Sequence, residues 1–201
     1  MAFQLEWETP VEWASLVAPH TLELLCDHAH AELRAAASAQ ALISKRPRSK
    51  HMVEALGQVA LDESEHFVQV IEILHRRGGQ LEAGRDNPYA AGLLSGWSSR
   101  HDEALLDRLL ISAVIEARSL ERFVLLAKHL PDAELREFYG SLVASEASHR
   151  SLFVTLAREI FSEERVAERL AEFLAMEAKV ISSLPFSPRM HSGMAVADAA
   201  V

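Results

Sequence analysis

Two stretches of the chain, "LDESEHF" and "SEASHRS", each place a glutamate three residues before a histidine. The pairs are Glu63 with His66 and Glu146 with His149. Side chains three residues apart on an α-helix lie on one face, so both members of a pair can point at the same object. Apolar residues surround both stretches, which predicts burial, and a buried carboxylate needs a partner or a metal ion. The repeated pair therefore predicts two helices that turn these side chains inward to hold metal.

Each pair is preceded by a single glutamate at nearly the same distance. The intervals are 31 and 30 residues long, and their ends are Glu32 with Glu63 and Glu116 with Glu146. A proline, which cannot continue a helix interior, lies near the middle of each interval, at Pro47 and Pro131. Equal arms on either side of a turn bring the two glutamates of an antiparallel hairpin to the same height. The chain is therefore predicted to repeat one hairpin, which reads Glu-x-Arg, turn, Glu-x-x-His.

The repeat also decides between two glutamates on the third long helix. Glu121 is the rival of Glu116, but it lies only 25 residues before Glu146, which breaks the symmetry and turns it off the ligand face. Glu116 is therefore the predicted ligand. The arginines of the repeat, Arg34 and Arg118, lie roughly opposite their glutamates on the helix and are predicted to be surface residues.

Helix periodicity and turn residues divide the chain into four long helices with shorter ones at both ends. The long connection over residues 78–100 carries several glycines and a proline and is predicted to be an irregular crossover. Thr21 is the predicted N-cap of the second helix, and Pro131 is predicted at the first position of the fifth. The predicted helices span residues 11–20, 21–44, 51–77, 102–130, 131–161 and 162–183.

Two short turns and one long crossover between four long helices are the connectivity of a ferritin-like four-helix bundle. The predicted fold is therefore all-α, with two helical hairpins joined by the crossover and additional N- and C-terminal helices. Residues 1–185 are expected to form a single domain and residues 186–201 a flexible C-terminal tail. The 201 residues suffice for one buried core, and a second is not needed.

Composition narrows the class of protein. No apolar run is long enough to span a bilayer, and the N-terminus has no basic and apolar leader pattern. The single cysteine, Cys26, excludes an intrachain disulfide and is expected to be a small buried helix residue. These features are typical of a cytoplasmic protein. A net charge of −9 argues against a broad nucleic-acid-binding surface, although not against a local one.

Four carboxylates and two imidazoles in this arrangement are typical of di-iron and di-manganese carboxylate bundles. Carboxylates suit hard cations, and imidazole shifts the preference toward iron or manganese over calcium or magnesium. The predicted metal ligands are Glu32, Glu63, His66, Glu116, Glu146 and His149.

Two polar neighbours of the ligands are candidates for orienting the histidines, since a ligating imidazole usually donates its second N–H to a fixed acceptor. Asp62 is predicted to accept from His149, and Ser145 holds the equivalent place toward His66. Local packing within the helices is an equally good account of both residues.

The helix around Glu32 leaves two further questions open. His28 lies one turn away and can either touch the metal site or be an ordinary core histidine. The small residues Ala35, Ala36 and Ala39 can either open a substrate pocket or allow close helix packing.

A basic cluster in the first hairpin turn is the candidate contact for an anionic partner. The sequence "KRPRSKH" holds Lys45, Arg46, Arg48 and Lys50, and the alternative is an ordinary solvated turn whose cations suit the helix C-terminus. Glu32 lies about 20 Å away along the helix, at 1.5 Å per residue, so this basic patch cannot touch a group at the metal site.

The stretches "AHAELRAA", "ALDESEHF", "IEARSLERF" and "SEASHRSLF" together resemble the MiaE family of tRNA hydroxylases over nearly the whole chain. The resemblance implies a ferritin-like non-haem di-iron monooxygenase. Its substrate would be the isopentenyl side chain of 2-methylthio-isopentenyl-adenosine, beside the anticodon in tRNA. The resemblance also places the family's iron ligands on the six residues predicted above, without a departure at any of them.

The resemblance implies further partners. The reaction takes O₂ as co-substrate, and because the sequence has no dinucleotide or flavin motif and no Cys-x-x-Cys pair, electrons are expected from a separate reductase. The anticodon stem-loop of tRNA is the expected macromolecular partner, and no membrane is expected. The protein is expected to be a monomer or small oligomer in the cytoplasm. The alternatives are a ferritin-like iron storage or detoxification protein and a di-manganese catalase.

Overall fold

The computed structural model describes residues 3–84, 86–98 and 101–194, without the side chains of residues 101 and 102. The described residues form helices and no β-strand. In chain order the helices are α1 (Glu12–Val17), the 3₁₀ turn η1 (Ala18–His20), α2 (Thr21–Lys45), α3 (Lys50–Arg76), α4 (Pro88–Leu94), α5 (His101–His129), α6 (Ala133–Ile160) and α7 (Glu163–Ser183).

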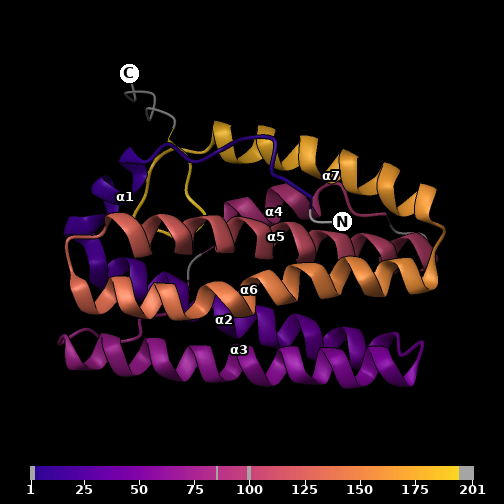
Figure 1. Ribbon diagram of the computed structural model, residues 1–201, viewed down its shortest axis with the longest axis horizontal. Helices are drawn as coiled ribbons and strands as arrows, with labels where there is room; N and C mark the ends of the chain where they lie inside the picture. The colour runs from indigo at the N-terminus through magenta and orange to yellow at the C-terminus, as the bar shows by residue number, and fades with distance from the viewer. Residues whose placement is uncertain (1–2, 85, 99–100, 195–201) are drawn as a thin grey trace.

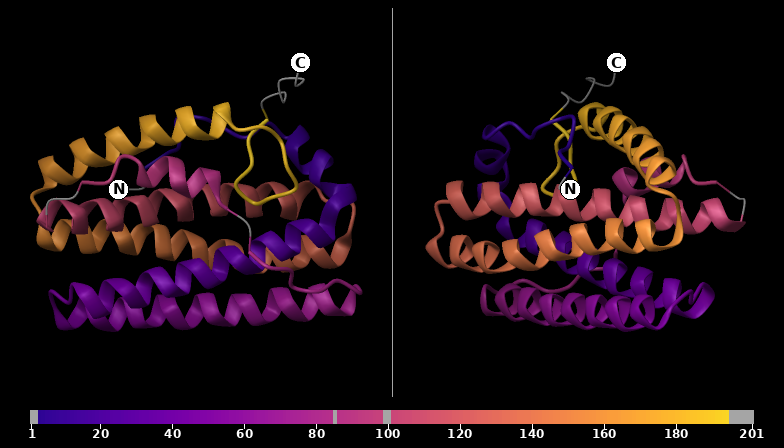
Figure 2. Two further views of the ribbon diagram at one scale, coloured as in Figure 1. Left: turned by 180° about the vertical axis from the view of Figure 1, so that it is seen from behind. Right: turned by 45° about the vertical axis from the view of Figure 1, so that its right-hand side comes forward.

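The four long helices form two antiparallel hairpins (Figure 1). α2 packs along α3 and α5 along α6, and the hairpins meet where α6 lies on α3. α7 lies across the outer side of α5, and the short α4 packs against both α5 and α7 (Figure 2). This arrangement confirms the predicted all-α ferritin-like bundle with additional helices. Among the helices of the described ranges, none is both long and apolar enough to cross a membrane.

Two predicted helix starts are wrong by one or two residues. Thr21 is the first residue of α2 and not its cap, because the preceding 3₁₀ turn runs directly into the helix at His20. Pro131 lies before α6, which begins at Ala133. There the Asp132 carboxylate accepts a hydrogen bond from a backbone N–H of the first turn, which fixes the start two residues later than proline alone predicts.

The crossover contains a helix that the sequence prediction treated as irregular. The Asn87 side chain caps α4 and Pro88 occupies its first turn, both of which are helix-start signals. Gly92 lies where α4 meets α7, and a Cβ at this position would come within 2.7 Å of the Val180 side chain. The glycine that suggested a break therefore permits close helix contact.

The apolar core is divided into two parts, and the predicted ligands lie between them. One part contains Leu56 of α3 and Val114 of α5, and the other contains Val70 of α3 and Phe123 of α5. Each long helix thus runs from one apolar cluster to the other and presents polar residues in between. Cys26 is half-buried and borders the second cluster, so it is less buried than predicted.

The chain after α7 packs on the bundle up to residue 194, which differs from the flexible tail predicted from residue 186. Met190 is fully buried, and Ser192 is 3% exposed. The Ser192 hydroxyl accepts from the Trp13 indole at 3.1 Å, and its carbonyl accepts from Arg122 at 2.7 Å. These contacts come from distant parts of the chain, which a local reading of residues 186–194 could not show. Residues 195–201 lie outside the described residues.

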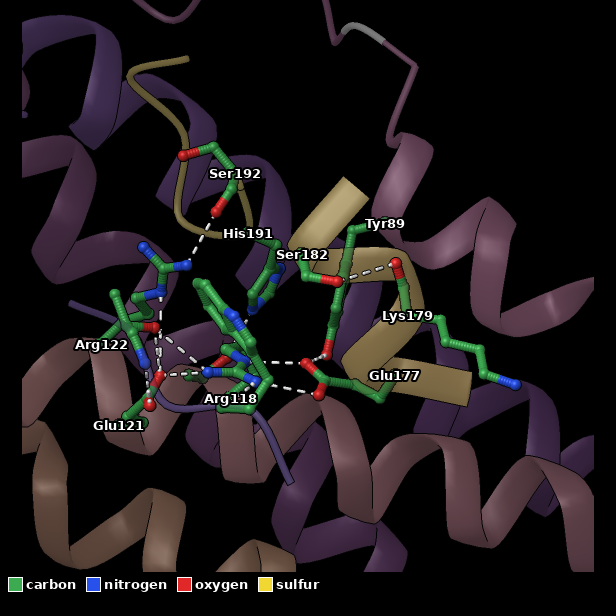
Figure 3. A network of polar contacts seen from close by, with 12 residues as sticks. Tyr89, Arg118, Glu121, Arg122, Glu177, Lys179, Ser182, His191 and Ser192 are labelled. Carbon is green, nitrogen blue, oxygen red and sulfur yellow. Dashed lines mark hydrogen bonds and ion pairs between the residues drawn. The ribbon is translucent and has the colours of Figure 1, made fainter. Parts of the chain in front are cut away.

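Arg118, predicted on the surface, is completely buried. Its guanidinium donates to both carboxylate oxygens of Glu177 at 2.8 and 2.9 Å, and it also contacts Glu121 (Figure 3). The hydroxyls of Tyr89 and Thr9 complete this set, hereafter the Arg118 network. The prediction is wrong because α7 and the N-terminal segment cover the outer face of α5.

Candidate metal centre

All six predicted ligands point into the centre of the four-helix bundle, one or two from each long helix. Every one is buried, and none is more than 7% exposed. α2 contributes Glu32, α3 contributes Glu63 and His66, α5 contributes Glu116, and α6 contributes Glu146 and His149. These six residues are called the ligand cluster below.

The ligand atoms fall into two overlapping groups, each with its atoms within 4.8 Å of one another. Glu63 and Glu146 belong to both groups. The other members are Glu32 and His66 in the first group and Glu116 and His149 in the second. Two adjacent groups that share two carboxylates have the form of a two-metal site, since a carboxylate can bridge two cations.

Four ligand atoms are buried without a hydrogen-bond partner among the described residues: Glu63 Oε1, His66 Nδ1, Glu146 Oε1 and His149 Nδ1. The His149 Nδ1 and Glu63 Oε1 atoms are only 2.7 Å apart, yet they lack hydrogen-bond geometry. Leaving such atoms unsatisfied costs roughly 1–3 kcal/mol each, and more for charged groups. The donor set therefore fits a pair of metal ions, which would satisfy all four atoms.

The carboxylates of the cluster disfavour one another's ionisation. Burial, followed by the nearby Glu63, raises the pKa of Glu32, and burial and Glu116 raise the pKa of Glu146. Burial and the charge of Glu63 raise the pKa of Glu116 to about 7. Although burial opposes ionisation of Glu63 too, contacts with Glu32 and the two cluster histidines lower its pKa. Bound cations would let all four carboxylates ionise.

Asp62 lies where a histidine-orienting residue is expected. Its Oδ2 is 3.1 Å from His149 Nε2, which leaves His149 Nδ1 facing the cluster. Burial opposes the protonated form of His149, but Glu63 and Glu116 outweigh it and raise its pKa to about 9. Ser145 differs from its prediction. Its hydroxyl lies 3.5 Å from His149 and not beside His66, because Ser145 and His149 are one turn apart on the same helix.

His28 touches the ligand cluster, one of the two outcomes that the sequence left open. Its Nε2 lies 2.5 Å from Glu32 Oε1, and its ring packs against Phe123 and Tyr139. Burial, with the nearby His66, lowers the pKa of His28 to about 3, so the ring is neutral at physiological pH. A neutral imidazole can orient the Glu32 carboxylate by donating Nε2–H.

Glu121, the rival of Glu116, points away from the cluster. Its carboxylate accepts from the Thr9 backbone at 2.8 Å and from the Thr9 hydroxyl at 2.6 Å, and it pairs with Arg118. Glu116 instead belongs to the second ligand group.

A cavity of about 200 Å³ opens beside the cluster between α2, α4 and α5. Glu116 lies in its wall, together with Ala35 of α2 and Arg108 of α5. Ala36 and Ala39 are buried in helix packing, so the alanines of α2 serve both of the functions that the sequence left open. Arg108 was missed by the sequence prediction, since nothing in its local pattern separates it from a surface arginine.

The predicted basic patch lies on the turn between α2 and α3, with Lys45, Arg48 and Lys50 exposed and Arg46 half-buried. Lys50 Nζ is 3.6 Å from Glu54 Oε1, a weak exposed ion pair. The structure does not bring the patch into the ligand cluster.

Comparison with known proteins gives the family. The family model for tRNA-(MS[2]IO[6]A)-hydroxylase (MiaE) matches residues 2–192. The chain belongs to the MiaE family. It is 35% identical over 192 residues to a Pseudomonas putida protein named tRNA 2-(methylsulfanyl)-N(6)-isopentenyladenosine(37) hydroxylase, covering 96% of this chain and 93% of that protein.

Two further similarities accompany this MiaE match. A Salmonella typhimurium protein of the same name is 34% identical over 151 residues, which cover 75% of this chain and 55% of that protein. A solved structure described as protein 43 with aldehyde deformylating oxygenase activity from Synechococcus superposes with a TM-score of 0.91. It is 36% identical, and the match covers 96% of this chain and 97% of that one.

Proposed function

We propose that this MiaE-family chain is an O₂-dependent di-iron monooxygenase that hydroxylates the isopentenyl side chain of 2-methylthio-isopentenyl-adenosine in tRNA. The observation that carries the proposal is the ligand cluster, six buried residues with four unsatisfied ligand atoms, in a chain of this family. The names of the relatives in Pseudomonas putida and Salmonella typhimurium supply the substrate class.

The two ligand groups suggest how each ion is held. Glu63 and Glu146 belong to both groups, so each of them would help to hold both ions. The mixture of carboxylates and imidazoles suits iron or manganese. Glu32 and His66 would hold one ion, and Glu116 and His149 would hold the other.

When bound, the iron pair supplies the O₂ activation that an unactivated C–H bond requires. The chain positions the ligands, with Asp62 fixing the His149 tautomer and His28 orienting Glu32. The apolar clusters on either side exclude water from the centre. The reaction inserts one oxygen atom of O₂ into the C–H bond and releases the other as water, which consumes two electrons and two protons. The electrons come from a separate reductase.

The family and the cavity beside Glu116 favour the hydroxylase over the two alternatives, iron storage and a di-manganese catalase. A protein that only stores iron, or a catalase, has no use for an organic-substrate pocket at the metal centre. As a tRNA-modifying enzyme, the protein would act in the cytoplasm on an anticodon stem-loop, as a monomer or small oligomer.

The deciding experiment incubates reduced, iron-loaded protein with O₂ and tRNA that carries the isopentenyl group without the hydroxyl. Nucleoside mass spectrometry should show the gain of one oxygen atom on the side chain, and none when O₂ is omitted or the metal is manganese. Protein with two bound irons that leaves the nucleoside unchanged in the presence of a competent reductant would contradict the proposal.

A further inference from the structure

The cavity beside Glu116 is lined mostly by apolar side chains, and Arg34 and Arg108 also belong to its lining. Its walls include Ala31 and Ala35 of α2, Ile111 and Ile115 of α5, and Phe153 of α6. Drug-sized ligands occupy pockets of roughly 300–1,000 Å³, so a cavity of about 200 Å³ is too small for a whole nucleotide. It has room for an aliphatic arm, and any ring attached to that arm must stay at the mouth.

Arg108 places an unneutralised cation at this cavity. Its Nη2 donates to the Ser38 hydroxyl at 2.8 Å, and no carboxylate among the described residues pairs with it. Burial lowers the pKa of Arg108, the effect of removing a cation from water without a compensating anion. A guanidinium held in this way suits a phosphate, which its planar fork can bind through two N–H groups.

Trp97 supplies an exposed aromatic surface next to Arg108. Its side chain is 44% exposed, whereas Trp13 is completely buried. The Arg108 guanidinium carbon lies 5.5 Å from the centre of the Trp97 ring, and the Trp97 backbone N–H donates to Leu94, which lines the cavity. The indole thus lies beside the Arg108 guanidinium, just beyond the end of α4, and part of it stays open to solvent.

We propose that Trp97 and Arg108 form the nucleotide-binding mouth of this cavity. In this arrangement, which rests on the proposed function, the modified purine stacks on the open surface of Trp97 and its phosphate pairs with Arg108. The aliphatic arm of the base enters the cavity, lies against Ala31 and Ala35, and reaches the wall that holds Glu116. Proteins read unpaired RNA bases by stacking them on aromatic side chains and arginine planes, the two groups present here.

The same geometry makes Ala35 a specificity-determining residue. An adenine without the alkyl arm would leave the apolar walls unfilled and gain only the contacts at the mouth. A larger side chain at this position would fill the cavity and remove the advantage of the modified base. Ala37, two residues along α2 and exposed, offers a matched substitution outside the cavity.

The first test measures tryptophan fluorescence, because a base that stacks on Trp97 should quench its emission. Iron(II)-loaded protein, kept anaerobic so that no turnover occurs, is titrated with an anticodon stem-loop that carries the isopentenylated base. Saturable quenching of tryptophan fluorescence is expected, and it should disappear in Trp97→Phe although Trp7 and Trp13 remain. Trp97→Ala should weaken binding of a dye-labelled stem-loop by about tenfold or more, since one base–aromatic stack has an effect of this size.

The second test measures discrimination. Wild-type protein should bind the isopentenylated stem-loop more tightly than the same stem-loop with plain adenine. Ala35→Leu should bring the ratio of the two dissociation constants close to one, and Ala37→Leu should preserve the wild-type ratio. Arg108→Gln should weaken both stem-loops and reduce the salt slope by about one, while Arg76→Gln, at the far end of the bundle, should change neither.

The outcomes separate this assignment from the proposed function. Unchanged fluorescence in the wild type, equal quenching in Trp97→Phe, or an unchanged discrimination ratio in Ala35→Leu would each overturn the binding mouth. If those variants hydroxylate tRNA as well as the wild type, the function stands and the mouth is wrong. If the wild type binds and discriminates as expected but never oxygenates the nucleoside, the mouth stands and the function is wrong.

Discussion

The bundle buries two clusters of charged side chains, the ligand cluster and the Arg118 network, and they differ in how their polar atoms are satisfied. In the Arg118 network every guanidinium nitrogen has a partner. Arg118 Nε and Nη2 donate to the Glu177 carboxylate, and Nη1 donates to the Thr9 hydroxyl. Arg118 Nη2 also donates to the Trp7 carbonyl. The neighbouring Arg122, with two nitrogens unsatisfied, instead lies 4.0 Å from the centre of the Trp13 ring.

In the ligand cluster the four unsatisfied atoms all belong to carboxylates and imidazoles that could hold a metal ion, and they lie around the same point. A buried polar group without a partner is unfavourable, so it persists where something outside the chain completes it. The comparison teaches that burial and charge alone do not identify a functional site in this bundle. Arg122 also has unsatisfied nitrogens, so the distinguishing property is that several unsatisfied atoms of ligand type lie around one point.

The largest expected effect comes from the shared ligands. Glu63→Gln keeps the shape of the side chain but removes a charge from both ligand groups. We expect iron content, measured by mass spectrometry of the reconstituted protein, to fall from about two ions per chain to near zero, with hydroxylation lost. Glu32→Gln, which alters one group only, should retain about one ion. Retention of both ions by Glu63→Gln would show that Glu63 is not needed to hold either of them.

The next effect separates two glutamates on α5. Glu116→Gln should lose metal and activity, because Glu116 belongs to the second ligand group. Glu121→Gln should keep its metal, since its contacts are with Thr9 and Arg118, and should only lower the unfolding midpoint. Metal content and thermal melting of the two variants decide the point. The reverse pattern would place the metal on the other face of α5.

Breaking the Arg118 network should affect stability and not metal binding. Glu177→Gln would leave the Arg118 cation buried without its main partner, which typically costs about 3–5 kcal/mol. Urea unfolding should report this loss, while iron content per folded chain stays at the wild-type value. Glu164→Gln, exposed on the same helix, should change the unfolding free energy by no more than about 0.5 kcal/mol. A fall in iron content in Glu177→Gln would link the two clusters.

The two clusters also differ in how well the sequence predicts them. The ligand residues follow a local rule, Glu-x-x-His, and a spacing rule set by hairpin arms of equal length. Both rules depend on helix geometry, which is regular, so the sequence could predict which residues meet. The four-helix bundle was predictable for the same reason.

The Arg118 network could not be predicted in this way. Glu177 is 59 residues away from Arg118, and the Trp7 carbonyl is 111 residues away. These contacts depend on how α7 and the N-terminal segment cross α5, which no periodicity in either segment specifies. The α4 helix, the packed segment to residue 194 and the charged mouth of the cavity were missed for the same reason. They are tertiary contacts between short or irregular segments.

The incomplete contacts of the ligand cluster should appear as a pH dependence of the metal-free protein. The pKa of Glu116 is raised to about 7 and that of His149 to about 9. Each raised pKa means that the group keeps its proton up to a higher pH in the folded state than in the unfolded chain. Stability is therefore fully present below the unfolded pKa values and is lost as pH rises, first through Glu116 and then through His149.

Bound metal should reverse this trend, because it replaces the protons and binds only the folded state. The increase in melting temperature caused by manganese(II), a redox-stable probe, should therefore grow between about pH 5 and pH 8. Glu116→Gln should flatten the decline of the metal-free protein. His28, whose pKa is lowered to about 3, acts in the opposite sense, so the decisive comparison is with the variant: a pH dependence that is unchanged in Glu116→Gln would contradict the role of Glu116.

The smallest expected effect concerns the basic patch on the surface. The question is again whether contacts within the chain satisfy its charged groups or a partner does. Lys50 already pairs with Glu54, which favours an ordinary turn, but the pair is exposed and weak enough to yield to a phosphate. The patch is too far from Glu32 to meet the reacting base, yet it could hold the stem of the anticodon arm.

Each phosphate contact adds roughly 0.7–0.9 to the slope of log affinity against log salt, so removing the cations should weaken tRNA binding by only about three- to tenfold. The variant replaces Lys45, Arg46, Arg48 and Lys50 by Ala, and its iron content and oxidation of a free nucleoside should equal those of the wild type. An unchanged affinity and salt slope would mean that the turn completes its own contacts, as the Arg118 network does, and that the stem of the tRNA docks on another surface.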